Sequence, residues 1–133
     1  MAERVYCLYR GKDQESILMQ KNACHDFTEK KGWNIVGEEQ EIGVSGYKAC
    51  ADDRVKLQRI RKAVEQGEFD ILLVFMYDRL GRNLNETPFI AEWFTKKGIH
   101  VWSVYEGEII DGVDAERMLD YIRFWQTDEA QKL

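Results

Sequence analysis

Four arginines lie at or shortly after the carboxyl ends of predicted strands. Arg10 ends the first strand, and Arg54 comes after the loop that follows the second. Arg79 and Arg82 follow the third, and their spacing of three would put them on one side of a helical turn. In open α/β sheets, ligands bind at the carboxyl ends of the strands. Guanidinium groups are planar and permanently charged, so the pattern predicts a site that stabilises charge on a phosphoryl group.

The alternative for each arginine is a helix cap or an ion pair with a surface carboxylate, and for a single arginine that would be the better interpretation. Four of them at strand ends favour a shared site. The sequence has no Gly-x-Gly-x-x-Gly string and no Gly-Lys-Ser/Thr loop, so it predicts no nucleotide cofactor. His25 and His100 are isolated in the sequence, which predicts no metal site.

Length and composition narrow the class of protein. The 133 residues suit one domain, and 44% hydrophobic residues are enough for a core. Lysine plus arginine number 19 against 24 acids, a net charge of −5, which argues against a histone-like binder. The three cysteines form no CxxC pair, and the longest apolar run, 71–76, is too short to span a bilayer. The sequence therefore predicts a soluble, cytoplasmic protein.

The elements that must position the arginines alternate between strand and helix. Strands are predicted over 5–9, from 33, over 70–76 and over 100–105, and the third lacks polar alternation, as a strand buried on both faces does. Four helices are predicted. The first carries Ile17, Gln20, Cys24 and Phe27 on one face, and the second has a stripe of Leu57, Ile60 and Val64. The third starts near Pro88, ends at Gly98 and carries Phe89, Ile90, Trp93 and Phe94, and the last, from Asp114, has a stripe of Met118, Ile122 and Trp125. Trp93, Trp102 and Trp125 are expected in the core. The prediction is a three-layer α/β fold, with a mostly parallel central sheet of about four to five strands and helices on both faces.

Two motifs carry a resemblance to a known family. Asp78-Arg79-Leu80-Gly81-Arg82-Asn83 follows a buried strand, and it is preceded by Gly43-Val44-Ser45-Gly46 and by Arg54. This arrangement resembles the catalytic domain of serine site-specific recombinases, the resolvase/invertase group. The segment from Tyr6 to Arg10 is similar to the start of the larger recombinases of mobile elements. The resemblance implies one resolvase-like catalytic domain over 1–133, and the family's C-terminal DNA-binding region is absent from this chain, as in an excised domain.

The resemblance also implies an activity and a set of partners. Family members cut DNA by attack of a serine hydroxyl on the phosphodiester, form a 5′-phosphoserine link and rejoin the exchanged strands. The covalent bond stores the phosphodiester energy, so no metal and no other cofactor is implied. The expected partner is double-stranded DNA. The expected assembly is a homodimer that becomes a tetramer in a synaptic complex, with no membrane involved.

Carried over position by position, the resemblance gives seven residues a place around the scissile phosphate. Arg10 matches the arginine that ends the first strand and touches the phosphate, and Gln20 resembles a glutamine that arranges the site. Ser45 matches the serine of the loop. The remaining four are the arginine that follows this loop and the acidic residue and two arginines of the second motif: Arg54, Asp78, Arg79 and Arg82.

The sequence departs from the family at the nucleophile. The family's serine lies two residues after the first-strand arginine, and here that position holds Lys12. Ser16, the nearest serine, is expected to cap the first helix, and Tyr9 is expected to be a packing residue. From the sequence alone the chain offers no hydroxyl at the expected place, so no covalent adduct with DNA is expected, and whether the chain is an enzyme stays open.

Two other functions stay open at this point. The chain could be a catalytically inactive recombinase-like module that binds DNA or dimerises through its last helix, with Phe124 and Trp125 as the contact face. It could also be a flavodoxin-like or receiver-like domain for a small phosphorylated ligand. A receiver would need an acidic pocket at the first strand, where Arg10 and Lys12 stand instead.

Overall fold

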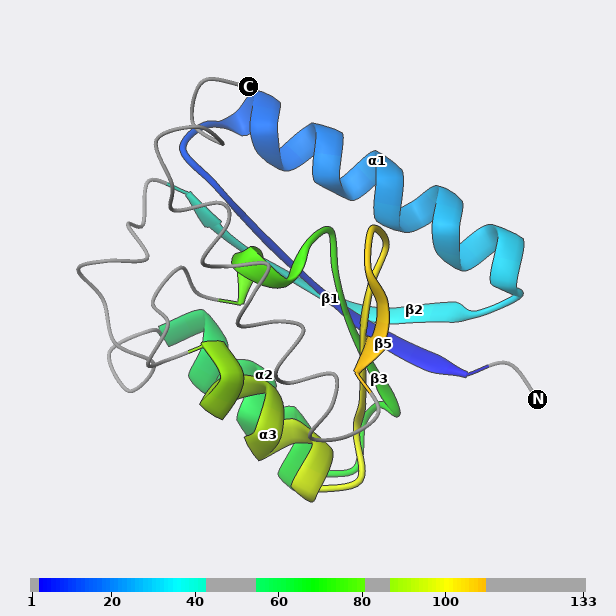
Figure 1. Cartoon of the computed structure of the whole chain (residues 1–133), viewed down its shortest axis with the longest axis vertical. Coiled ribbons are helices and arrows are strands. Elements are labelled where there is room, and N and C mark those ends of the chain that lie inside the picture. Colours follow the sequence, from blue (N-terminus) through cyan, green and yellow to red (C-terminus); the bar gives the residue numbers. More distant parts are fainter. Residues whose placement is uncertain (1–2, 43–54, 81–86, 110–133) are drawn as a thin grey trace.

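A computed structural model describes residues 3–42, 55–80 and 87–109 as a sheet covered by helices (Figure 1). The sheet has five strands in the order β2-β1-β3-β4-β5. The first four are parallel, and β5 runs antiparallel to β4. The strands are β1 (Arg4–Gly11), β2 (Asn34–Ile42), β3 (Ile71–Val74), β4 (His100–Ser103) and β5 (Gly107–Ile109). The predicted α/β fold with a mostly parallel sheet is confirmed.

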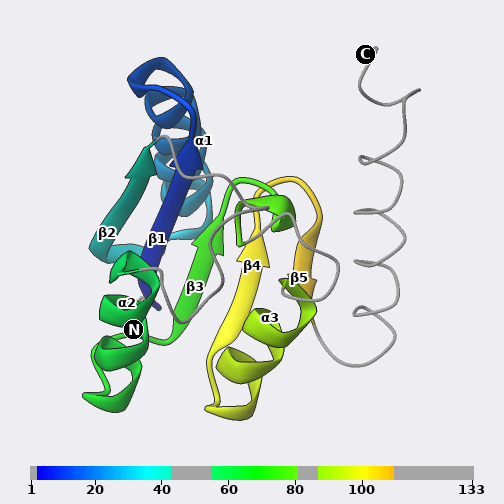
Figure 2. The same cartoon turned by 90° about the vertical axis from the view of Figure 1, so that its left-hand side faces the viewer.

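Helices cover both faces of this sheet. The long helix α1 (Gln14–Lys31) lies on one face, and α2 (Val55–Glu65) and α3 (Thr87–Lys96) lie on the other (Figures 1 and 2). A short 3-10 helix, η2 (Tyr77–Arg79), follows β3. Within the described ranges, no helix has both the length and the apolar character needed to cross a membrane.

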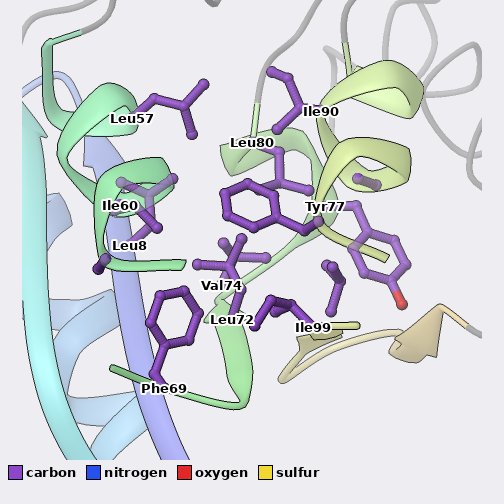
Figure 3. Packing of buried hydrophobic residues seen from close by; sticks show 14 residues of the cluster. Leu8, Leu57, Ile60, Phe69, Leu72, Val74, Tyr77, Leu80, Ile90 and Ile99 are labelled. Atoms are coloured by element: carbon purple, nitrogen blue, oxygen red, sulfur yellow. The ribbon is translucent and has the colours of Figure 1, made fainter. Parts of the chain in front are cut away.

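The core has one cluster on each face of the sheet. On the α2/α3 side, Leu8, Leu72 and Val74 pack against both helices (Figure 3). On the α1 side, Cys7 and Leu73 belong to the second cluster. All four residues of β3 are buried, which explains why this segment shows no polar alternation. The alternating side chains of β1 and β3 thus hold the two helical layers to one sheet.

One prediction about aromatic residues is wrong in part, that of a core position for Trp93 and Trp102. Phe89, at the start of α3, is 66% exposed. Ile90 and Phe94, four residues apart, lie on the buried face of α3, and Phe89 lies off that face. Trp93 and Trp102 are partly buried at the margins of the two clusters instead of enclosed in them.

A hydrogen-bonded chain ties α1 to the sheet on the side of the second cluster. The Tyr9 hydroxyl donates to Glu38 Oε2 over 2.6 Å, and His25 Nε2 lies 2.7 Å from the same oxygen. Burial alone would raise the pKa of Glu38, but the hydrogen bonds from His25 and Tyr9 outweigh it and lower that pKa. Tyr9 is 1% exposed, so its predicted packing role is confirmed.

This contact predicts a pH-dependent contribution to stability. Because the folded-state pKa of Glu38 is lowered, its stabilising effect is present above the ordinary carboxyl pKa and is lost as pH falls through the lower folded value. We expect Glu38→Gln to reduce the free energy of unfolding by about 1 kcal/mol at pH 7 and by less at a pH below the ordinary carboxyl range. Urea titrations at the two pH values measure this difference. Glu29→Gln, an exposed acid on α1, is the control, and an equal loss for Glu38→Gln at both pH values would contradict the prediction.

Candidate functional site at the carboxyl edge of the sheet

The carboxyl end of β1 is held by the side chain of Gln20. The Arg10 backbone N–H donates to Gln20 Oε1 over 3.1 Å, and Gln20 Nε2 donates back to the Arg10 carbonyl over 2.8 Å. The pairing of β1 with β3 ends at Leu8, so the glutamine amide takes the place of a strand partner at Arg10. Gln20 is fully buried because it shares the inner face of α1 with Ile17 and Cys24.

Arg79 reaches the same point from the next strand. It ends η2, directly beyond β3, and its Nη1 donates to the Arg10 carbonyl over 3.2 Å. Arg10 is 4% exposed and Arg79 is half-buried, so Arg79 is the more accessible of the two cations. The structure thus brings together Arg10, Gln20 and Arg79, while their roles toward a substrate remain predictions.

The other predicted site residues fall outside what the structure describes. Ser45, Arg54 and Arg82 lie outside the described residues, as do the Gly43–Gly46 loop and the predicted last helix with Trp125. Of Asp78 the backbone is described, within η2, and its side chain is not.

A carboxylate that the sequence analysis missed fixes the turn bearing Arg79. Glu106 accepts hydrogen bonds from the Ser103 hydroxyl, at 2.7 Å, and from the Tyr77 backbone N–H, at 3.3 Å. Ser103 Oγ in turn accepts from the Glu106 N–H over 2.7 Å, and the Tyr77 hydroxyl donates to the Gly107 carbonyl. The connection between β4 and β5 therefore holds η2 at both its backbone and its first side chain. The signal in the sequence is Ser-x-x-Glu after a strand, a spacing typical of side chain–backbone turns.

A second missed acid lies beside Arg10. Glu41 on β2 is the register partner of Arg10, and both are 4% exposed. Parallel neighbours in register project from the same face, so an acid and a base share this buried corner. Burial of charges is tolerated in proteins when opposite charges lie close together. A buried acid and a buried base therefore occupy neighbouring positions at the edge that Arg79 also reaches.

The predicted cap role of Ser16 is wrong. Asp13 is the N-cap of α1, and its Oδ1 accepts from the Ser16 backbone N–H over 2.9 Å. Ser16 therefore lies inside the first helical turn, where its hydroxyl oxygen accepts a hydrogen bond from Gln20 Nε2 over 3.3 Å. It also lies against the end of β1, because a Cβ placed on Gly11 would be 2.5 Å from Ser16 Oγ. The glycine leaves the space that this hydroxyl occupies.

Fold and site together define an α/β domain in which the Arg79 side chain reaches the Arg10 backbone at the carboxyl edge of a mostly parallel sheet. The family model "Resolvase, N terminal domain" matches residues 10–129, and the chain belongs to this family. It is a serine recombinase catalytic domain of the resolvase type. The match begins at Arg10, the residue that Gln20 and Arg79 both contact.

Solved structures show the same architecture. The N-terminal catalytic domain of TP901-1 integrase superposes with a TM-score of 0.74 at 24% identity, covering 97% of this chain and 98% of that one. The C-terminal catalytic domain of ISC1926 TnpA, an IS607-like serine recombinase, has a TM-score of 0.67 at 26% identity over 77% of this chain and 70% of that one. A resolvase family recombinase from Streptococcus pneumoniae has a TM-score of 0.68 at 21% identity over 98% and 89%. No curated protein matches the chain.

Proposed function

We propose that this domain binds a phosphodiester of double-stranded DNA at the carboxyl edge of its sheet and cleaves and rejoins the strand through a covalent phosphoserine-type intermediate. The observation that carries the proposal is the contact of Arg79 Nη1 with the Arg10 carbonyl, 3.2 Å away. It brings the permanent positive charge of Arg79, which follows β3, to the backbone of Arg10 at the end of β1. Family membership supports the same chemistry.

The proposal gives each residue a task. Arg79, the more accessible cation, pairs with the phosphate oxygens and stabilises the charge that grows on them during transfer. Arg10 adds a second charge behind it, and Gln20 fixes the strand end that carries Arg10. From the sequence pattern, Arg54, Arg82, Ser45 and Asp78 complete the site around the phosphate and the leaving oxygen.

DNA binding as a function of salt tests the proposal. Four arginines can neutralise only a few phosphates, and the net charge of −5 opposes closer approach of the duplex, so we expect weak binding without sequence preference. The slope of log affinity against log salt should lie at about −2 to −4. Arg79→Ala should weaken binding and reduce the magnitude of that slope by about 0.9. Fluorescence anisotropy with labelled duplexes provides the measurement.

Arg4→Ala is the matched control, since it removes the same charge at the opposite end of β1. Arg4 pairs there with Asp70 at 3.0 Å. Its loss should leave the salt slope unchanged, although it changes the net charge equally. Equal effects of the two variants would show that binding follows net charge alone. Tight binding that discriminates between sequences at physiological salt would also contradict the proposal.

We further propose that the domain works as a homodimer, with two dimers forming a tetramer around paired DNA sites. Strand exchange between two duplexes requires a cut in each of four strands, hence four nucleophiles. Sedimentation velocity with and without duplex DNA measures the assembly. A domain that stays monomeric with DNA at all concentrations would overturn this part.

A further inference from the structure

We propose that Ser16 is the nucleophile of this chain, supplied by the first turn of α1 in place of a serine in the strand-one loop. The inference rests on the proposed function, because it names the group that attacks the phosphodiester held there. Its basis is the placement of the Ser16 hydroxyl at the end of β1, together with Gln20 and Arg10.

The hydroxyl is positioned by the network that also holds the arginines. Ser16 Oγ accepts from Gln20 Nε2 over 3.3 Å, and the same nitrogen donates over 2.8 Å to the Arg10 carbonyl that Arg79 contacts. One amide nitrogen therefore links the hydroxyl to the Arg10 carbonyl, which Arg79 also contacts. In its contact with Gln20 the hydroxyl oxygen acts as acceptor, so its proton is directed elsewhere.

The short connection between β1 and α1 brings the hydroxyl there. Only Lys12 and Asp13 separate the last residue of β1 from the first residue of α1. The first helical turn is thereby placed directly over the strand end, and the missing side chain of Gly11 makes room for Ser16 Oγ. Ser16 itself is half-buried, whereas Ser103 is fully buried. Of these two serines, Ser16 is therefore the one with a solvent-exposed part.

Asp13 is the carboxylate that we assign to receive the proton of the hydroxyl. It caps the helical turn that carries Ser16, and its Oδ1 accepts from the Ser16 backbone N–H over 2.9 Å. In the step we propose, Ser16 Oγ forms a bond to phosphorus and its proton passes to Asp13. The bond from phosphorus to the leaving O3′ breaks, the electron pair stays on O3′, and O3′ takes a proton from solvent. No oxidant, metal or further reactant enters.

An activated phosphodiester tests the nucleophile without knowledge of a target sequence. With bis(4-nitrophenyl) phosphate, attack by Ser16 releases one nitrophenolate and leaves a phosphodiester on the serine. We expect a burst of about one nitrophenolate per chain, because covalent capture of the first turnover precedes any hydrolysis. Tandem mass spectrometry should map the adduct to Ser16. An adduct on Lys12 or Tyr9, or no adduct, would overturn the proposal.

Variants separate a nucleophile from a structural serine. Ser16→Ala should reduce the burst at least about a hundredfold, and Ser16→Cys should restore an adduct at this position through its sulfur. Gly11→Ala should reduce the burst by displacing the hydroxyl, and Asp13→Asn should slow it while keeping the helix cap. Glu15→Ala, an exposed neighbour on α1, is the control that should leave the burst unchanged. A full burst from Ser16→Ala would overturn the assignment.

The DNA-binding experiment keeps this proposal distinct from the proposed function. If Arg79-dependent DNA binding is observed and no adduct forms, Ser16 is not the nucleophile and the phosphate site stands. If neither is observed, both proposals fail. An adduct on Ser16 that depends on Arg79 supports both.

Discussion

Gln20→Leu is expected to lower the free energy of unfolding by about 3 kcal/mol, although leucine has a similar volume and suits a fully buried position. The substitution removes both hydrogen bonds to the Arg10 backbone. The Arg10 N–H then loses its bond to Gln20 Oε1, and the carbonyl loses its bond from Gln20 Nε2 while that from Arg79 remains. An unsatisfied buried polar group costs about 1–3 kcal/mol, so the backbone penalty exceeds any gain from a more apolar side chain.

Chemical denaturation at neutral pH measures this loss. Gln14→Leu provides the matched control, because Gln14 begins the same helix but is exposed. Its effect should stay within about 0.5 kcal/mol. If the Gln20 variant were as stable as the unchanged protein, the amide could not be the partner that ends β1.

Leu80→Ala is expected to cost about 3 kcal/mol, within the range of about 2–5 kcal/mol for a buried leucine. Leu80 directly follows Arg79, is fully buried, and packs among Leu57, Ile60 and Ile90 (Figure 3). Truncation leaves a cavity between α2, α3 and the end of β3. Because Leu80 anchors η2 to the core, the same change should also loosen the turn that presents Arg79.

Thermal or urea unfolding quantifies the cost, with Leu18→Ala as the control. Leu18 lies on α1 and is 57% exposed, so the identical chemical change should cost less than about 1 kcal/mol there. The DNA affinity of Leu80→Ala, measured where the variant is still folded, should fall with the loosening of η2. Equal costs at Leu18 and Leu80 would contradict the packing described for this turn.

The parts of the fold that the sequence predicts are those governed by local patterns. Gly32 ends α1, because its φ of 74° lies in the left-handed region that glycine adopts freely. The unbroken apolar run of β3 indicated a strand covered on both faces. The helical spacing of Ile17, Gln20 and Cys24 placed a glutamine on the buried face of α1, and from there it reaches β1.

The parts that the sequence missed depend on partners distant along the chain. No end was predicted for the strand from residue 33, and β2 continues to Ile42 because β1 offers register partners as far as Gly11. The role of Glu106 arises only when β5 folds back and brings it to Tyr77. Serine and aspartate are both favoured at the N-cap of a helix, and Ser16 was predicted to be that residue. Because α1 starts at Gln14, the N-cap is Asp13 instead.

The position of β5 has a consequence for local motion. Among the described strands it is the outermost on its side, three residues long and paired only with β4, whereas β1 lies between two partners. Short edge elements open with less free energy than interior strands, so backbone amides exchange with solvent there first. Because Glu106 and Gly107 hold Tyr77, each such opening also releases the turn that carries Arg79. The opening of β5 thus sets how often η2, which carries Arg79, is released, while Arg10, on the interior strand β1, stays in place.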